Sequence, residues 1–216
     1  MCGKFTQMMS WSELVTLADL VGAPRSAVET VTPMRFATVI RLDAHGKREA
    51  VRMRWGLVPS GARDPSDGTR FIHARAETIE QKPTFRDAFF NRRGLVVVST
   101  FNEGKEITPK KTEQYVVTPT GRAATAIAVI WERWSDHNAG TLETFAMVTV
   151  PPNALIATIT DRMPALVGDE DWAKWLGEEE ASLDDLKAAL RTSDLAMNME
   201  KAGKPPPKPA RQPDLF

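Results

Sequence analysis

The residue in the most unusual chemical setting is Cys2, the only cysteine among the 216 residues. An initiator methionine is usually removed when a small residue follows it, and loss of Met1 would give Cys2 a free α-amine beside its thiol. The ordinary pKa values of these two groups, about 7.7–8.0 and about 8.5, leave some of each unprotonated near neutral pH. Such a pair can add to an aldehyde as a Schiff base and close a thiazolidine ring, or act in acyl transfer. A lone cysteine is also often a small, unreactive core residue.

Residues that could assist a cysteine nucleophile stand at two further places. His73, Arg75 and Glu77 alternate along the sequence, so on a β-strand their side chains would share one face. Three ionisable side chains on one face rarely point into a core, so this face is expected to meet solvent or to line a polar site. Glu103 directly follows an apolar segment, at a strand end where loops tend to carry function. An ordinary surface position is the alternative for this glutamate.

The distribution of charge suggests where an anion could bind. The net charge is zero, but residues 35–93 carry 13 Lys or Arg against 7 Asp or Glu, whereas residues 94–200 carry 9 against 17. The basic segment could line an anion-binding channel, or both segments could form mixed, solvated surfaces. Arg162 could likewise hold a phosphate or pair with Asp161 next to it.

The composition also limits the class of protein. Hydrophobic residues make up 42% of the chain, which is enough for the core of one domain. No apolar run approaches the roughly 20 residues that span a membrane, and the first residues lack a signal-peptide pattern. A cytoplasmic protein with no membrane partner is therefore expected. One cysteine and three scattered histidines offer no metal-ligand cluster, so no metal or other cofactor is expected.

Hydrophobic periodicity indicates the elements that must position these residues. Apolar and alternating segments predict strands, with hairpin turns at residues 43–46 and 119–121. The predicted strand regions are 35–59, 70–77, 94–101, 114–134 and 141–150. Helical spacing and capping signals, among them Ser182 with Asp185, predict helices. The predicted helices cover residues 10–22, 82–90, 169–176 and 182–191. This order favours an α+β domain with a curved, partly closed, mainly antiparallel sheet flanked by short helices.

Five segments, taken in order, resemble the SRAP domain family (SOS response-associated peptidase). Each is short, but their order and spacing make a chance match unlikely, and they extend from residue 2 to about residue 190. The matching segments are "MCGKFT" at 1–6, "RWGLVPS" at 54–60, "HARAETIEQKPTFRDAF" at 73–89, Glu103, and "VTVPPNALIATITDRMPALV" at 148–167. The SRAP-like domain is placed at residues 2–195, before a disordered Pro/Lys-rich tail at residues 196–216.

The resemblance implies a function. Members of the family bind single-stranded DNA and capture abasic sites as a thiazolidine DNA–protein crosslink, which here would form through Cys2 and protect the lesion during replication. Glu103 would assist ring opening and proton transfer. The residues that would hold the DNA are Lys4, which replaces an arginine, Arg75, Thr149 and Arg162. Two alternatives stay open: a cysteine-type hydrolase or autopeptidase, and a non-covalent adaptor for single-stranded DNA.

Some residues depart from the family pattern. His73 stands where the family has asparagine, and Thr160 stands where it has a histidine implicated in handling the sugar. His73 could therefore supply the missing imidazole from another wall of the pocket, or both changes could reflect drift to a subfamily with altered kinetics. The segments at 102–104 and 60–61 lack aromatic residues of the family, so fewer stacking surfaces are expected.

The end of the sequence has a resemblance of its own. "QPDLF" at 212–216 is similar to the pentapeptide through which bacterial proteins bind the sliding clamp, with Gln212, Leu215 and Phe216 as the contact residues. A motif on a flexible tether would raise the local concentration of the domain near replicated DNA. The expected picture is a monomer associated with the nucleoid, with abasic single-stranded DNA and the clamp as partners.

Overall fold

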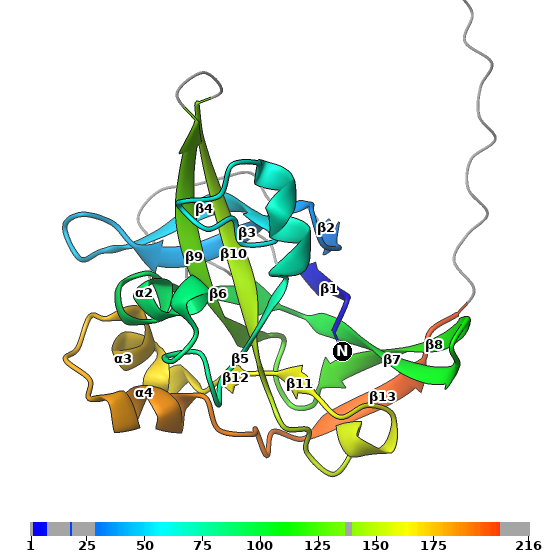
Figure 1. Cartoon of the computed structure of the whole chain (residues 1–216). Coiled ribbons are helices and arrows are strands. Elements are labelled where there is room, and N and C mark those ends of the chain that lie inside the picture. The colour runs from blue at the N-terminus through cyan, green and yellow to red at the C-terminus, as the bar shows by residue number, and fades with distance from the viewer. Residues whose placement is uncertain (1, 8–17, 19–28, 137–139, 204–216) are drawn as a thin grey trace, which may run out of the picture.

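The computed structural model describes residues 2–7, 18, 29–136 and 140–203, which form two β-sheets surrounded by short helices (Figure 1). The smaller sheet has the order β13-β8-β7-β1-β2. Its strands are β1 (Lys4–Gln7), β2 (Glu29–Val31), β7 (Thr100–Thr108), β8 (Lys111–Pro119) and β13 (Met197–Lys201). The predicted helix at 10–22 lies outside the described residues, apart from residue 18.

The larger sheet curls into a ring. Strand β10 pairs with β4 on one side and with β9 on the other, and the order β4, β3, β6, β9 closes the circuit. Among the described strand pairs that close the ring, β10–β4 is the only parallel one. The strands of this sheet are β3 (Phe36–Leu42), β4 (Arg48–Trp55), β5 (His73–Arg75), β6 (Arg93–Val98), β9 (Thr125–Asp136), β10 (Gly140–Val150), β11 (Met163–Pro164) and β12 (Leu166–Val167). The expected α+β class with a curved, partly closed sheet is confirmed.

The core fills the ring because its strands are apolar over most of their length. In β6 every residue after the first is buried, and in β9 the first six residues are buried. On β4 the alternation of buried Met53 and Trp55 with more exposed Arg52 and Arg54 turns one face of the strand inward. The Trp55 ring stacks on Phe145 of β10, with 6.2 Å between the ring centroids.

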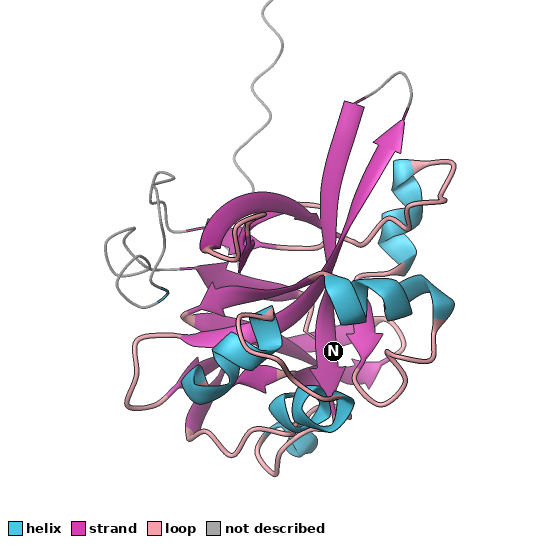
Figure 2. Ribbon diagram, turned by 90° about the vertical axis from the view of Figure 1, so that its left-hand side faces the viewer, coloured by secondary structure: helices cyan, strands magenta, loops and turns pink. Residues whose placement is uncertain are grey.

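The helices lie around the outside of the sheets (Figure 2). The α-helices are α2 (Pro83–Asn91), α3 (Trp172–Leu176) and α4 (Leu183–Ala189), and the 3-10 turns are η1 (Pro65–Arg70), η2 (Ile156–Thr158) and η3 (Asp169–Asp171). The predicted capping box is confirmed: the Ser182 side chain accepts the backbone N–H of Asp185, and the Asp185 carboxylate accepts that of Ser182.

Two strand predictions are wrong in their pairing. Residues 114–134 do not form a hairpin, because β8 belongs to the smaller sheet and β9 to the ring, and residues 120–124 carry the chain between them. The single strand expected at 94–101 is likewise divided at Ser99 into β6 and β7. Both segments have the apolar character of strands, but periodicity does not reveal which sheet each half joins.

The expected start of the disordered tail is also too early. Residues 197–201 form β13, which pairs antiparallel with β8. Just beyond this strand, Ala202 N–H donates to the Gln114 carbonyl at 2.7 Å. Met197 and Met199 alternate with polar residues and pack against the core, which is the two-residue period of a strand. The remainder of the tail, residues 204–216, lies outside the described residues.

Candidate functional site

The pairing of β1 with β7 places Cys2 next to Glu103. The register joins Lys4 to Asn102 and Phe5 to Phe101, so the chain preceding β1 runs alongside the middle of β7. Cys2 is 1% exposed, and its Sγ donates to the Lys4 carbonyl at 3.4 Å. The thiol is therefore held in a fixed, largely dry position.

His73 reaches the same residue from the ring. Strand β5 pairs parallel to β10, with His73 opposite Met147. The Nε2 atom of His73 lies 2.7 Å from the carbonyl oxygen of Cys2, and its ring stands edge-on to Trp55 at 6.0 Å. A carbonyl oxygen only accepts hydrogen bonds, so Nε2 carries the proton and donates it. Trp55 also contacts Phe5 at 5.2 Å between centroids, which gives the site an aromatic wall.

Glu103 is the buried carboxyl group of this site. It is fully buried, and burial raises its pKa to about 7. The positive charge of the chain's α-amine opposes this rise in pKa, the negative charge of Asp161 adds to it, and the nearby backbone N–H of Cys2 opposes it to a smaller extent. A carboxyl group with this pKa is present in both protonation states near neutral pH, as a group that exchanges protons during a reaction requires.

Burial also sets the ionisation of the other two groups. It raises the pKa of the Cys2 thiol, and the charge of Glu103 raises it further. Burial lowers the pKa of His73 to about 4, although the hydrogen bond to Cys2 acts in the opposite direction. At neutral pH the site therefore holds a neutral thiol, a neutral imidazole and a carboxyl group that titrates.

The four residues expected to hold DNA differ in their accessibility. Lys4 and Arg75 are exposed. Arg162 is only 8% exposed, and its guanidinium binds both carboxylate oxygens of Glu77 at 2.6 and 2.9 Å. It also donates to the carbonyl oxygen of Thr149 at 2.6 Å and to its hydroxyl at 3.2 Å. Thr149 itself is buried between β5 and β11, opposite Arg75 and Pro164.

These contacts correct one sequence interpretation and place Asp161 beside a different residue. Arg162 pairs with Glu77, not with its sequence neighbour Asp161. Asp161 instead lies close enough to Glu103 to influence its pKa. Thr160 precedes it, half-buried, and its backbone N–H donates to the Ile156 carbonyl at 3.0 Å. The loop between η2 and β11 therefore brings residues 160 and 161 to the rim of the Cys2 site.

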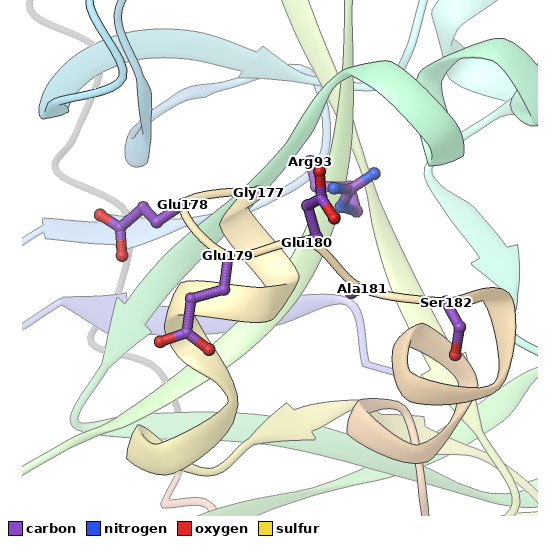
Figure 3. Close-up of a pocket in the computed structure, with 7 residues that line it drawn as sticks. All are labelled: Arg93, Gly177, Glu178, Glu179, Glu180, Ala181 and Ser182. Carbon is purple, nitrogen blue, oxygen red and sulfur yellow. The ribbon is translucent and has the colours of Figure 1, made fainter.

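One hollow among the described residues lies away from Cys2. It has a volume of about 680 Å³ and lies between Arg93 and residues 177–182, three of which are glutamates (Figure 3). Arg93 donates to the backbone carbonyls of Phe89, Phe90 and Trp175, so it ties the ends of α2 and α3 together. This arginine has a structural role, and the hollow has no contact with the groups described above.

Neither a metal centre nor a membrane span emerges from the described residues. Nowhere in them do three His, Cys, Asp or Glu side chains converge as metal ligands. Their helices are also too short to cross a bilayer.

The fold has close counterparts among solved structures. A protein from Bacteroides thetaiotaomicron superposes with a TM-score of 0.82 at 23% identity, covering 94% of this chain and 93% of that one. A protein from Bordetella bronchiseptica gives a TM-score of 0.77 at 20% identity, covering 94% and 100%. These similarities establish a shared architecture.

Sequence comparison assigns the family. The profile of the SOS response associated peptidase (SRAP) family matches residues 1–203, and the chain belongs to this family. The resemblance seen in the five sequence segments is thus confirmed. Among its relatives are the abasic site processing proteins YoaM and YoqW of Bacillus subtilis, at 30% and 29% identity. Each comparison covers 90% of this chain, and 87% and 88% of the relative. The abasic site processing protein HMCES of Xenopus tropicalis is 27% identical, over 60% of this chain and 45% of its own length.

Proposed function

We propose that this protein binds single-stranded DNA and captures abasic sites through Cys2, after removal of Met1, as a thiazolidine crosslink. The observation that carries the proposal is the contact between the backbone nitrogen of Cys2 and the buried carboxyl group of Glu103. Once Met1 is removed, that nitrogen is the α-amine. The names of the Bacillus relatives support abasic-site processing as the setting.

The geometry suits each step of the condensation. The α-amine adds to the sugar aldehyde, and the resulting carbinolamine loses water to give an imine. The neutral Glu103 carboxyl group can donate a proton to the departing oxygen, and its carboxylate can accept one from the nitrogen. The Cys2 sulfur then bonds to the imine carbon, and the thiol proton passes to the nitrogen. The sum is one aldehyde and one aminothiol giving one thiazolidine and one water.

We propose that His73 acts by hydrogen bonding rather than by proton transfer. Its Nε2–H is already donated to the Cys2 carbonyl, and its low pKa keeps the imidazole neutral. These two properties fit a group that orients the first peptide so that amine and thiol face the same point. They do not favour His73 as a replacement for the histidine that the family has at position 160.

The exposed cations Lys4 and Arg75 are proposed to contact the DNA backbone on either side of the lesion, because phosphate contacts position a strand without reading its sequence. Arg162 would contribute mainly by fixing Thr149 and Glu77 behind them.

A denaturing gel tests the proposal. Purified protein, confirmed by mass spectrometry to start at Cys2, is incubated with a single-stranded oligonucleotide that contains one abasic site. A shifted band is expected for the wild type and not for Cys2→Ala. The proposal is wrong if the wild type gives no shifted band while it still binds intact single strands, which is the behaviour of a non-covalent adaptor. Release of a peptide from its own N-terminus without any crosslink would instead indicate the autopeptidase.

We also propose that residues 212–216 bind the bacterial sliding clamp. The support is the sequence "QPDLF", which ends in the apolar pair Leu215–Phe216 behind a Pro/Lys-rich segment. Deletion of residues 212–216 should abolish retention on immobilised clamp and leave crosslinking unchanged. Equal retention of the full-length and shortened proteins would rule the motif out.

A further inference from the structure

One exposed aromatic residue stands among arginines on the outer face of β3 and β4. Phe36 is 43% exposed, an unusual position for a phenylalanine within a strand. It lies opposite Arg54 in the register of these two strands. Arg52, two residues along β4, points to the same face, and its Nη2 donates to the Phe36 carbonyl at 3.0 Å. Arg35 precedes Phe36 and is exposed as well.

This face thus carries a strip made of Phe36 with Arg35, Arg52 and Arg54. Most of the positive charge of the strip is uncompensated. Arg52 forms a two-pronged ion pair with Glu29 and contributes no net charge. Arg35 and Arg54 have no carboxylate partner within the ranges that the structure describes. Arg54 donates only to the Pro65 carbonyl, at 2.5 Å, and its Nε atom is buried without an acceptor. The strip therefore presents an aromatic face beside two positive charges.

The backbone directs Phe36 outward and connects it to the Cys2 site. Both Met34 and Arg35 bond to Trp55: Met34 N–H donates to its carbonyl at 2.8 Å, and the Arg35 carbonyl accepts its N–H at 2.9 Å. Two residues facing one form a β-bulge, a device that changes the direction of the side chains that follow. Met34 has φ 68°, a conformation that no other described non-glycine residue adopts. Trp55 in turn forms the wall against His73, so the strip begins directly behind that wall.

We propose that Phe36 is a stacking platform for a base of the single strand that flanks the lesion, with Arg35 and Arg54 as its phosphate contacts. An aromatic side chain between cations is the arrangement by which proteins bind single strands without sequence preference. The proposal rests on the proposed function, since the same strand would pass through the Cys2 site. It also gives this chain a stacking surface, although residues 60–61 and 102–104 carry no aromatic side chain.

Fluorescence anisotropy with an intact single-stranded oligonucleotide tests the platform. Phe36→Ala should weaken binding about five-fold or more, whereas Phe36→Trp should bind at least as tightly as the wild type. Phe90→Ala is the matched control, because Phe90 is similarly exposed, at 40%, on the separate helix α2. Its affinity should stay at the wild-type value. Thermal melting of all three variants establishes that each is folded.

Two further readouts make the test specific for stacking on DNA. A 2-aminopurine base placed within a few nucleotides of the abasic site should be quenched by the wild type and by Phe36→Trp, but not by Phe36→Ala. Arg35→Gln should lower the slope of log affinity against log salt by about 0.7, the loss of one phosphate contact on a single strand.

The outcomes separate this proposal from the one on which it rests. If the wild type crosslinks but Phe36→Ala binds and quenches as the wild type does, the platform is overturned and the function of Cys2 stands. If binding depends on Phe36 but the wild type gives no crosslink, the platform stands and the crosslinking proposal falls. If the wild type does not bind single-stranded DNA at all, both are overturned.

Discussion

The Nε2–H of His73 is donated to the carbonyl oxygen of Cys2 across 2.7 Å, so a residue 71 positions away in sequence fixes the first peptide of the site. The imidazole cannot give this proton to a substrate without losing that bond. This hydrogen bond thereby fixes the position of Cys2, before β1, relative to that of His73 in the ring.

Replacement of His73 should separate positioning from proton transfer. Asparagine has an N–H donor, so His73→Asn should retain most of the crosslinking rate, whereas His73→Ala should lose about 3- to 10-fold, the value of one hydrogen bond. The rates are compared by stopping the reaction at set times and measuring the crosslinked band on denaturing gels. A loss of rate in both variants, with disappearance of a pH inflection near 4, would mean that the imidazole transfers protons.

The same residue should leave a mark on stability. Unfolded His73 binds a proton below its ordinary pKa of 6.5, but the folded state binds it only below about 4. The unfolded state therefore holds more protons between these values, and the free energy of unfolding should fall as the pH is lowered through this window. The fall attributable to His73 should be about 2–3 kcal/mol at most, and His73→Asn should lack it. Urea titrations of both proteins between pH 4 and 7.5 measure the difference.

Glu103 should act in the opposite direction over nearly the same window. Its folded-state pKa of about 7 lies above its ordinary value of 4.5, so the folded state binds more protons between the two. Its contribution to stability is complete below pH 4.5 and is lost as the pH rises to 7. Glu103→Gln should therefore be more stable than the wild type at pH 8, by about 1–3 kcal/mol, and equal to it at pH 4.

Crosslinking should show the catalytic side of Glu103. The wild-type rate should change with an inflection near pH 7, where the carboxyl group titrates. Glu103→Gln should lack that inflection and react about 100-fold more slowly. If Glu103→Gln keeps the wild-type pH profile, Glu103 does not transfer the proton.

An additional residue before Cys2 should abolish the crosslink even though the thiol is intact. If Gly is inserted between Met1 and Cys2, the Cys2 nitrogen becomes an amide and cannot form an imine. Gly3→Ala is a suitable control, since a Cβ at that position meets no atom within 4 Å, and it should crosslink normally. Mass spectrometry of the protein–DNA product distinguishes a thiazolidine from a simple thiol adduct. A crosslink of wild-type yield from the inserted variant would contradict the two-nucleophile mechanism.

Glu77 should stabilise the fold at some expense to DNA binding. It holds Arg162 with both carboxylate oxygens, so Glu77→Gln should lower the free energy of unfolding by about 1–2 kcal/mol. The same change removes a negative charge beside Arg75 and leaves Arg162 without its counter-charge, so affinity for single strands should rise. Denaturant titration and anisotropy check the two effects, and weaker DNA binding by a folded Glu77→Gln protein would overturn the argument.

Local signals in the sequence were sufficient where structure depends on neighbours along the chain. The turn at residues 43–46 gave the β3–β4 hairpin, and Ser182 with Asp185 marked the start of α4. The proximity of Cys2 and Glu103 followed only from the family resemblance, because their contact depends on the pairing of β1 with β7.

Structure that depends on distant partners was missed for the same reason. The turn signal at residues 119–121 is the same whether the chain folds back as a hairpin or crosses to another sheet. Asp161 is adjacent to Arg162 in sequence, yet Glu77 reaches that arginine because β5 and β11 lie on either side of Thr149. The exposure of Phe36 was not predicted, since a strand pattern does not show that a bulge turns the residue outward.

The pairing of β13 with β8 fixes the origin of the tether. It holds residue 203 at the edge of the sheet whose third strand, β7, carries Glu103, about 10 Å away across two strand spacings. The 13 residues from 204 to 216 can extend at most about 45 Å. A clamp held by the last five residues would thus be confined to a short radius around the lesion. Under the proposed clamp binding, the anchored strand would limit capture to abasic sites within this distance of the clamp.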